Sequence, residues 1–328
     1  MINSCLRRIA LGALALTLSS ATLAATYAAK LAHAAGEQTT FNVSMQKFAD
    51  VVRQKSGGQI DIKVFHSSQL GGERDYVEGL QLGSVEFAAV TTSIMGSFEP
   101  RMSVFSLPFL FRSPEHFDAV VDGPIGTEIA GRLATRSMRV LGYTDMGSRY
   151  IHNSRHPVKT PADLANLKMR VPQDNVPLET YAALGARAVP MAWPEVYSAV
   201  KQGVIDGLDN ALIFYESSGV YEGAPYLTYG VPIFQSTGLL LVSDSFYRKL
   251  PDDLKKVVSD AAREMIPEQR RSFRADSMAV LERLKAKGVK VEVADPAPFS
   301  AKAVPVWKKF ASQVGGQQVI DAIYAVGR

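Results

Sequence analysis

The sequence predicts an α/β protein of two lobes bridged by a long, kinked helix. Strand-like and helix-like patterns alternate from Tyr27 to Val242, as they do in α/β folds with parallel strands. About 300 residues remain after a short export segment, a length that suits two lobes better than one domain. A helical pattern over residues 251–288 is too long for one small lobe, since a helix rises about 1.5 Å per residue.

The N-terminus has the form of a signal peptide. Arg7 and Arg8 precede an apolar run over residues 9–18, which is too short to span a bilayer, and small residues follow it. We expect cleavage near Ala24 or Ala25 and a mature protein in the periplasm. General secretion is the preferred export route, and the arginine pair leaves the twin-arginine route open.

Cysteine usage and charge exclude several classes of function. Cys5, the only cysteine, leaves with the signal peptide, so we expect no disulfide, cysteine-zinc site or cysteine nucleophile. Loss of Arg7 and Arg8 also lowers the formal net charge from +4 to +2, and no basic block remains. We therefore expect no nucleic-acid partner.

The first half of the chain contains a strand, a helix and a second strand. Residues 60–65 alternate apolar and polar side chains, as in a half-exposed strand, whereas residues 85–90 form the continuous apolar run of a buried one. Between them, Leu70-Gly71-Gly72 predicts a turn and Glu73–Leu82 a helix with acids in its first turn. We interpret this as a βαβ unit.

The second half repeats this order with clear start and stop signals. Threonine, proline and an acid mark one helix start, and glycines mark helix ends. The signals predict a short helix at Thr160-Pro161, helices from about Val176 to Gly185 and from Pro194 to Gly203, and short strands at 188–190 and 204–205.

The long helix begins after Pro251 with two acids and carries an apolar stripe at helical spacing as far as Gly288. Pro267 lies inside the pattern and is expected to bend the helix rather than end it. With this helix as the bridge, we expect a signal peptide (1–25), one lobe of 26–147 plus about 236–266, and a second lobe of 148–235 plus about 267–328.

Signatures of catalysis are absent from the sequence motifs. There is no GxSxG, HExxH, Walker or GxGxxG pattern. The one close histidine pair, His152 and His156, lies on a proline-containing strand and loop, where solvated loop histidines are a better explanation than a metal site. We expect no metal, no cofactor and no enzyme activity.

A binding site has a positive argument. Arg170 lies at the carboxyl end of a strand that runs into Pro172, where open α/β sheets bind ligands, and Arg149 ends another strand-like run. A guanidinium pairs with a carboxylate bidentately. Trp193 could supply a stacking wall and Asn210, after a short strand, a donor and an acceptor. Plain alternatives are a solvated strand face for Arg170, a core position for Trp193 and a turn for Asn210.

These segments, in this order and spacing, resemble the periplasmic solute receptors of TRAP transporters, the DctP family. The similarity covers nearly the whole mature chain. It is carried by Lys30–His33, Ser67–Arg74, Leu107–Phe111, Lys159–Leu164, Leu167–Pro172, Pro190-Met191, Glu195–Tyr197 and Val204–Gly207.

The resemblance implies a two-lobe periplasmic binding protein fold (type II-like) that closes on a carboxylate and delivers it to the small and large permease subunits. It implies an anion-clamping role for Arg170, aided by Arg149, and ligand-lining roles for the remaining candidates. These are Asn210, Trp193, Glu73, Thr91, Thr92 and His33. We expect a monomer with no cofactor.

The chain departs from the family pattern at three places. Asp206-Gly207-Leu208-Asp209-Asn210 stands where Asp-Gly-Gln-Glu-Asn is common, Trp193 replaces phenylalanine, and Thr91 and Ile94 argue against sialic acid. The polar complement favours a sugar acid, a uronate or aldonate. A C4-dicarboxylate or an aromatic or branched oxo-acid stays open, as do two other classes, an exported α/β enzyme and a sensor input module.

Overall fold

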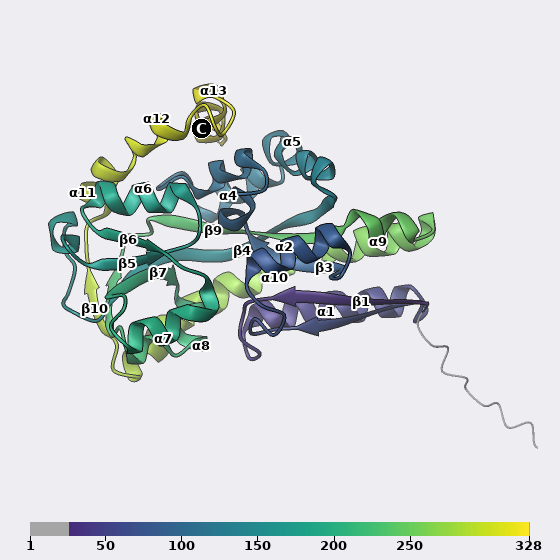
Figure 1. The fold of residues 1–328 in the computed structure, drawn as a ribbon, viewed down its shortest axis with the longest axis horizontal. Helices are drawn as coiled ribbons and strands as arrows, with labels where there is room; N and C mark the ends of the chain where they lie inside the picture. Colours follow the sequence, from purple (N-terminus) through teal and green to yellow (C-terminus); the bar gives the residue numbers. More distant parts are fainter. Residues whose placement is uncertain (1–25, 328) are drawn as a thin grey trace, which may run out of the picture.

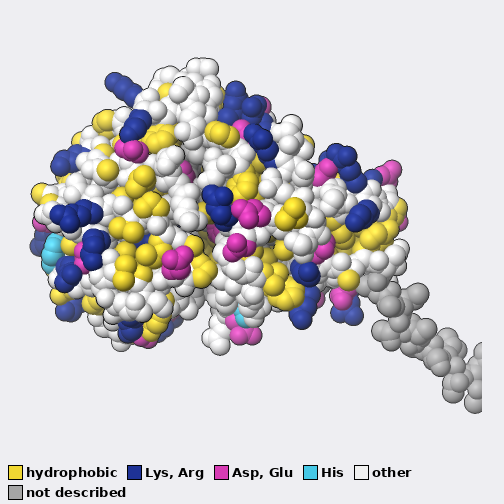
Figure 2. Space-filling model, in the orientation of Figure 1, with side chains coloured by type: hydrophobic (Ala, Val, Ile, Leu, Met, Phe, Trp, Pro, Cys, Tyr) yellow, Lys and Arg dark blue, Asp and Glu magenta, His cyan; other side chains and the backbone are white. Residues whose placement is uncertain are grey.

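The computed structural model describes residues 26–327 as a two-lobed α/β protein (Figure 1). The expected signal peptide and its cysteine fall within residues 1–25 and lie outside the described residues. No helix of the described part has both the length and the apolar character that crossing a membrane requires. On the face shown in Figure 2, basic and acidic side chains are interspersed rather than gathered by sign.

Ten strands form one continuous sheet within the described residues, in the order β2-β1-β3-β9-β4-β7-β5-β6, with β8 added to β4 and β10 to β8. The strands at each end of this order pair in parallel, and the long β4 and β9 pair antiparallel between them. The strands are β1 (Tyr27–His33), β2 (Ile60–Phe65), β3 (Phe87–Thr91), β4 (Met138–Asn153), β5 (Lys168–Val171), β6 (Arg187–Pro190), β7 (Gly207–Ala211), β8 (Tyr226–Tyr229), β9 (Phe234–Ser243) and β10 (Lys290–Val293).

Helices cover both faces of this sheet (Figure 1). The α-helices are α1 (Thr40–Lys55), α2 (Glu73–Leu82), α3 (Thr92–Met95), α4 (Pro114–Val121), α5 (Pro124–Gly131), α6 (Asn175–Leu184), α7 (Val196–Lys201), α8 (Leu212–Ser217), α9 (Asp244–Lys249), α10 (Asp252–Ala286), α11 (Pro296–Ala303), α12 (Val306–Phe310) and α13 (Gln317–Ala325). Short 3-10 turns are η1 (Pro100–Ser106), η2 (Arg132–Arg136), η3 (Pro161–Leu164), η4 (Trp193–Glu195) and η5 (Val220–Glu222).

Most of the local predictions are confirmed. The strand at 60–65 and the helix at 73–82 have the predicted bounds, and α6 ends at Gly185, whose φ of 97° is the left-handed conformation that glycine favours. The strand predicted at 204–205 is wrong, because Val204 is 51% exposed and β7 begins only at Gly207. The observed strand β7 buries polar side chains, so a search for apolar runs could not find it.

The core has three parts. One lies under α1 and α10, a second under α2, η1 and α4, and a third around β5 and α6. The C-terminal helices α12 and α13 join the second part; α12 lies over α6 in Figure 1, and α13 is bonded to α4 through His116 and the Ile323 carbonyl (2.8 Å). The end of the chain, which we assigned to the second lobe, thus packs against elements of the first.

The long strands β4 and β9 change register where they pass between the two halves of the molecule. One half contains β1, β2 and β3, and the other contains β5, β6 and β7. The shift lies between Asp145 and Ser148 of β4, and Gly147 there has a φ of 86°. The Asp145 carboxylate accepts hydrogen bonds from the Gly147 N–H (2.8 Å), from Gln235 of β9 (2.6 Å) and from Arg274 of α10 (2.7 Å). These bonds fix the irregular segment in one geometry.

The long helix α10 runs unbroken through Pro267. Its first part is tied to the first half of the sheet on both sides of that proline, by Glu264 to Lys55 (2.5 Å) and by Arg270 to Asp122 (2.6 Å). Its last turns are tied to α8 of the other half, by Arg283 to Glu216 (2.9 Å). The bend at Pro267 stays a prediction. The helix is attached to the first half of the molecule both before and after this proline.

A buried carboxyl lies where the two halves meet beside α6. Asp174 caps that helix, and its Oδ1 accepts from the Val176 N–H (3.1 Å), while its Oδ2 has no partner among the described residues. Burial raises the pKa of Asp174 to about 6, against hydrogen bonds that lower it. Ionising this group in the folded protein is therefore unfavourable.

Replacing Gly147 by alanine should destabilise the protein by about 2–4 kcal/mol, for two reasons. Alanine is strained in the left-handed backbone conformation of this position, and its Cβ would clash with neighbouring side chains. That atom would lie 2.9 Å from the Phe273 ring and 3.0 Å from Ala211. Gly203→Ala is the control, with a φ of 70° and open space around it, and should cost about 1 kcal/mol. Urea unfolding measures both, and equal losses would refute the steric part of this explanation.

Asp174→Asn should stabilise the protein at pH 7.5 but hardly at pH 4. A raised pKa means that the folded state holds the proton more tightly, so this stabilisation is lost as pH rises from 3.8 to about 6. The asparagine keeps the cap and removes the charge, for a gain on the order of 1–3 kcal/mol. Thermal unfolding at both pH values measures it. Asp295→Asn, at the exposed cap of α11, is the control and should not stabilise the protein at pH 7.5.

Candidate functional site

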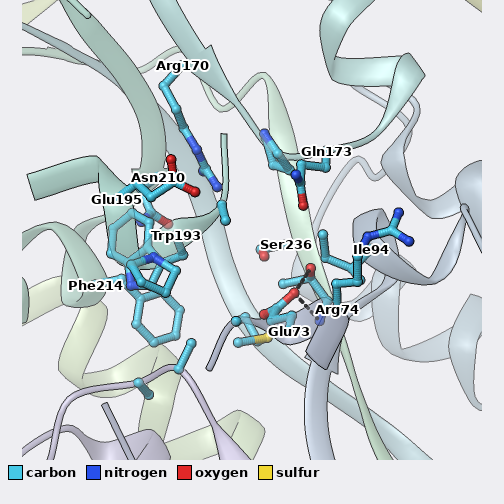
Figure 3. Close-up of a pocket in the computed structure, with 18 of the residues that line it drawn as sticks. Glu73, Arg74, Ile94, Arg170, Gln173, Trp193, Glu195, Asn210, Phe214 and Ser236 are labelled. Atoms are coloured by element: carbon cyan, nitrogen blue, oxygen red, sulfur yellow. Dashed lines mark hydrogen bonds between the residues drawn. The ribbon is translucent and has the colours of Figure 1, made fainter. Parts of the chain in front are cut away.

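A cavity of about 440 Å³ opens between the halves of the molecule, at the carboxyl ends of several parallel strands. Figure 3 shows Arg170, Trp193 and Asn210 on one wall and Glu73 on the opposite wall, with Ser236 between them. The lining residues are Ala34, Ala35, Gly71, Gly72, Glu73, Arg74, Asp75, Thr91, Ile94, Met146, Arg149, Arg170, Pro172, Gln173, Ala192, Trp193, Pro194, Glu195, Asn210, Phe214 and Ser236.

Arg170 is a buried cation without an acidic partner among the described residues. It is 5% exposed, so the solvated strand face considered above is wrong for this side chain. Its Nε and Nη2 both donate to the Met191 carbonyl (2.9 and 2.7 Å), which leaves the Nη1–Nη2 edge for a ligand. Burial, and after it the charge of Arg149, lower the pKa of Arg170 to about 9. The group is still protonated at neutral pH, and it lacks a counter-ion.

Arg149 lies beside Arg170 but is already paired. Its Nε donates to Asp209 Oδ2 (2.6 Å) and its Nη2 to the Asp209 carbonyl (2.8 Å). Burial alone would lower the pKa of Arg149, but the Asp209 carboxylate raises it above the usual value. Arg149 therefore also presents its Nη1–Nη2 edge to the cavity, while Asp209, on its other side, compensates its charge.

Asp209 has a further neighbour on the side away from the cavity. Its Oδ1 and the Tyr181 hydroxyl are both buried without a hydrogen bond of good geometry among the described residues. Burial, and after it the charge of Asp209, raise the pKa of Tyr181 well above its ordinary value. The phenol therefore keeps its proton and faces a carboxylate.

The amide of Asn210 has a defined orientation. Asn210 lies within β7, not in a turn, and its Oδ1 accepts the Ala211 N–H (2.8 Å). The backbone can only donate there, so the oxygen is assigned and the NH₂ group is left to face the cavity. Asn210 thus presents donors beside the two arginines.

Trp193 forms the adjoining apolar wall. It is half-buried at the start of η4, and its ring centroid lies 5.7 Å from Arg170 Cζ, within the range of a cation–π contact. The core alternative is therefore wrong for Trp193, although it packs at the core edge. An indole in this position can cover one face of a ligand held by Arg170.

The opposite wall carries a carboxylate. Glu73, at the first position of α2, accepts from the Thr91 N–H (3.2 Å) and the Thr91 hydroxyl (2.5 Å) through one oxygen, Oε2 (Figure 3). Burial raises the pKa of Glu73, while Thr91 and the two arginines lower it. Glu73 is therefore placed to accept a hydrogen bond from a ligand through its other oxygen.

The structure brings together six of the eight sequence-predicted residues: Arg170, Arg149, Asn210, Trp193, Glu73 and Thr91. Thr92 and His33 are buried and do not belong to the lining. Thr92 starts α3 with its side chain in the core, and His33 bonds Asn42 (3.1 Å). Burial lowers the pKa of His33 to about 4, so it is neutral.

Sequence reasoning missed several lining residues. Gln173, Glu195 and Ser236 are polar, and Met146 and Phe214 are apolar; Ile94, used above only to argue against sialic acid, also lines the cavity. Ser236 and Met146 come from the crossing strands, where no motif marks a ligand contact. Among residues 26–327 no three histidine, cysteine or acidic side chains form a group that could hold a metal ion. His152 instead bonds the Asn210 carbonyl (3.2 Å).

Comparison with known proteins gives consistent matches. The family model described as bacterial extracellular solute-binding protein, family 7 (DctP) matches residues 31–313. A solute-binding protein of Chromohalobacter salexigens is 34% identical over 82% of this chain and 80% of its own.

Solved structures match over almost their whole length. The sugar acid binding protein of Advenella mimigardefordensis, in complex with galactonate, superimposes with a TM-score of 0.88 and 29% identity, over 92% of this chain and 97% of that one. A TRAP periplasmic solute binding protein from Sulfurospirillum deleyianum with bound succinate also has a TM-score of 0.88 and 29% identity, over 92% and 99%.

Proposed function

We propose, because this chain belongs to the family of bacterial extracellular solute-binding proteins, family 7 (DctP), that its cleft captures a sugar acid for a TRAP transporter. Members of this family are periplasmic receptors that bind organic acids and are not enzymes. The chain is therefore a TRAP solute receptor for an organic acid. The uronate or aldonate ligand, its contacts and its delivery to the small and large permease subunits are our proposal.

One observation carries the proposal, the uncompensated charge of Arg170. A buried cation bonded only to a neutral carbonyl is unfavourable until an anion joins it. The free guanidinium edge accepts the two oxygens of a carboxylate, and Arg149 and the Asn210 amide add donors beside it. A carboxylate in this position satisfies all three groups.

The remaining walls suit the rest of a sugar acid. Glu73 Oε1 and the Thr91 hydroxyl oxygen can accept hydrogen bonds from ligand hydroxyls opposite Arg170, and Trp193 covers the less polar face of the carbon chain. The galactonate of one relative supports this class. The succinate of another keeps a C4-dicarboxylate as the alternative, and the Trp193 surface an aromatic or branched oxo-acid.

Closure of the cleft would exclude water and strengthen these contacts, so the ligand would favour the closed form by its higher affinity for it. The proposed lobes are 26–147 with about 236–266, and 148–235 with about 267–328. We propose that the mature protein acts in the periplasm as a monomer. Thr92 and His33 would support the wall behind Thr91 without touching the ligand.

Arg170→Ala should weaken binding of a sugar acid at least tenfold, which corresponds to about 1.4 kcal/mol or more. The variant removes the cation that pairs with the carboxylate. Isothermal titration calorimetry with galactonate and galacturonate measures the change. Lys168→Ala is the control, since Lys168 precedes it by two residues on β5 but bonds the Gly203 carbonyl outside the cavity. Unchanged affinity in Arg170→Ala would overturn the assignment.

Trp193 should report binding by its fluorescence. A carboxylate next to Arg170 and a carbon chain on the indole change its surroundings, whereas Trp307 bonds the Pro108 carbonyl (2.9 Å) away from the cavity. We expect a saturable emission change with ligand in the native protein and in Trp307→Phe, and none in Trp193→Phe. A full signal in Trp193→Phe would place the ligand elsewhere.

A further inference from the structure

We infer that this cleft selects acids with a single carboxylate and discriminates against dicarboxylates of the same length. The inference rests on the proposed function and concerns the end of the ligand remote from Arg170. Relatives of equal similarity hold a sugar acid and a dicarboxylate, so the choice has to come from residues of this chain.

The formal charges of four groups in and behind the cavity walls sum to zero before any ligand enters, although Arg170 itself contacts no acid. Two cations, Arg149 and Arg170, face two carboxylates, Asp209 and Glu73. Asp209 is fully buried and pairs with Arg149 at 2.6 Å, so that cation is already neutralised. Arg170 alone is left to compensate an incoming anion, and it can compensate one carboxylate.

Glu73 selects the chemical group at the end of the ligand remote from Arg170. Its Oε2 is occupied by both donors of Thr91, which leaves Oε1 to accept a further hydrogen bond. A hydroxyl can donate to that oxygen. An ionised carboxylate has no proton to donate, and it would add a second negative charge beside the first in a site sheltered from water.

No other lining group offers the second carboxylate a buried cation. The remaining charged lining residues, Arg74, Asp75 and Glu195, are exposed at the opening of the cavity, and two of the three are acids. Arg74 pairs with Glu78 on its own helix (3.7 Å). Charges in contact with water are screened and contribute little.

The hydrogen-bond argument applies to ionised Glu73, whereas the charge argument holds for both of its protonation states. Burial raises the pKa of this carboxyl, and the bound carboxylate would raise it further. With Glu73 ionised, one ligand carboxylate already leaves the buried groups with an excess negative charge. With Glu73 protonated, one carboxylate balances them. A second carboxylate is in excess in either state.

The test compares acids that differ only in whether the terminal carbon is CH₂OH or carboxylate. Suitable pairs are galactonate with galactarate and erythronate with meso-tartrate, titrated by calorimetry at pH 7.5 and low salt. For the native protein we expect at least tenfold tighter binding of the monocarboxylate in any pair that binds. A dicarboxylate bound as tightly as its partner would overturn this inference and leave the proposed function intact.

Glu73→Gln removes the charge and keeps the size and a hydrogen-bonding oxygen. We expect it to lower the ratio of dissociation constants, dicarboxylate to monocarboxylate, at least fivefold. Asp209→Asn removes the other buried carboxylate and should lower the ratio in the same direction, by less. Asp61→Asn is the matched control, because this exposed acid on β2 pairs with Arg53 away from the cavity. It should leave the ratio unchanged.

An unchanged ratio in a folded Glu73→Gln protein, checked by its unfolding midpoint, would overturn the inference. The native-protein comparison already decides it if that variant fails to fold. Absence of binding for every carboxylate tried, in native protein with a normal unfolding transition, would contradict the proposed function and this inference together.

Discussion

The site depends on one constraint, a guanidinium held in the cleft without a counter-ion. Arg170 is kept there by the strand that carries it and by two hydrogen bonds to the Met191 carbonyl. Both use the side edge of the fork, so its orientation is set before a ligand arrives. Preorganisation of this kind raises affinity, because less side-chain freedom is lost on binding. Arg149 is held in the same way by Asp209.

The sequence correctly predicted those helices and strands whose ends are determined by neighbouring residues, such as turns and helix caps. The turn at Leu70-Gly71-Gly72 and acids in the first helical turn were enough for α2, and Gly185 was enough for the end of α6. The strand β7 was missed, because its buried polar residues are satisfied by partners far away in the chain. The antiparallel pairing of β4 and β9 and the packing of α13 on α4 are also long-range, and no local pattern encodes them.

The site residues divide in the same way, into those that local sequence indicates and those that depend on contacts between distant parts of the chain. Arg170 could be chosen because a cation at a strand end is visible in sequence, Arg149 was chosen for the same reason although it lies inside β4, and resemblance added Glu73 and Thr91. The compensation of Arg149 by Asp209 could not be predicted, since the two residues are 60 positions apart and meet only through strand pairing. Thr92 and His33 show the reverse. They adjoin lining positions, but the alternation of a strand end and the start of a helix turn their side chains into the core.

The ion pairs of α10 are concentrated toward its two ends, with few between Arg274 and Arg283. Arg274 is the last of the arginines bonded to Asp118, and Arg283 is the first residue bonded to Glu216 of the other half. Between them Asp276 bonds Thr40 and Arg283, Val280 is buried in the core, and Met278 is 76% exposed. This stretch of about 12 Å is therefore the part of α10 with the fewest ionic attachments to either half. Relative rotation of the two halves, which the proposed closure requires, would twist the helix there, together with β4 and β9, which also join the halves.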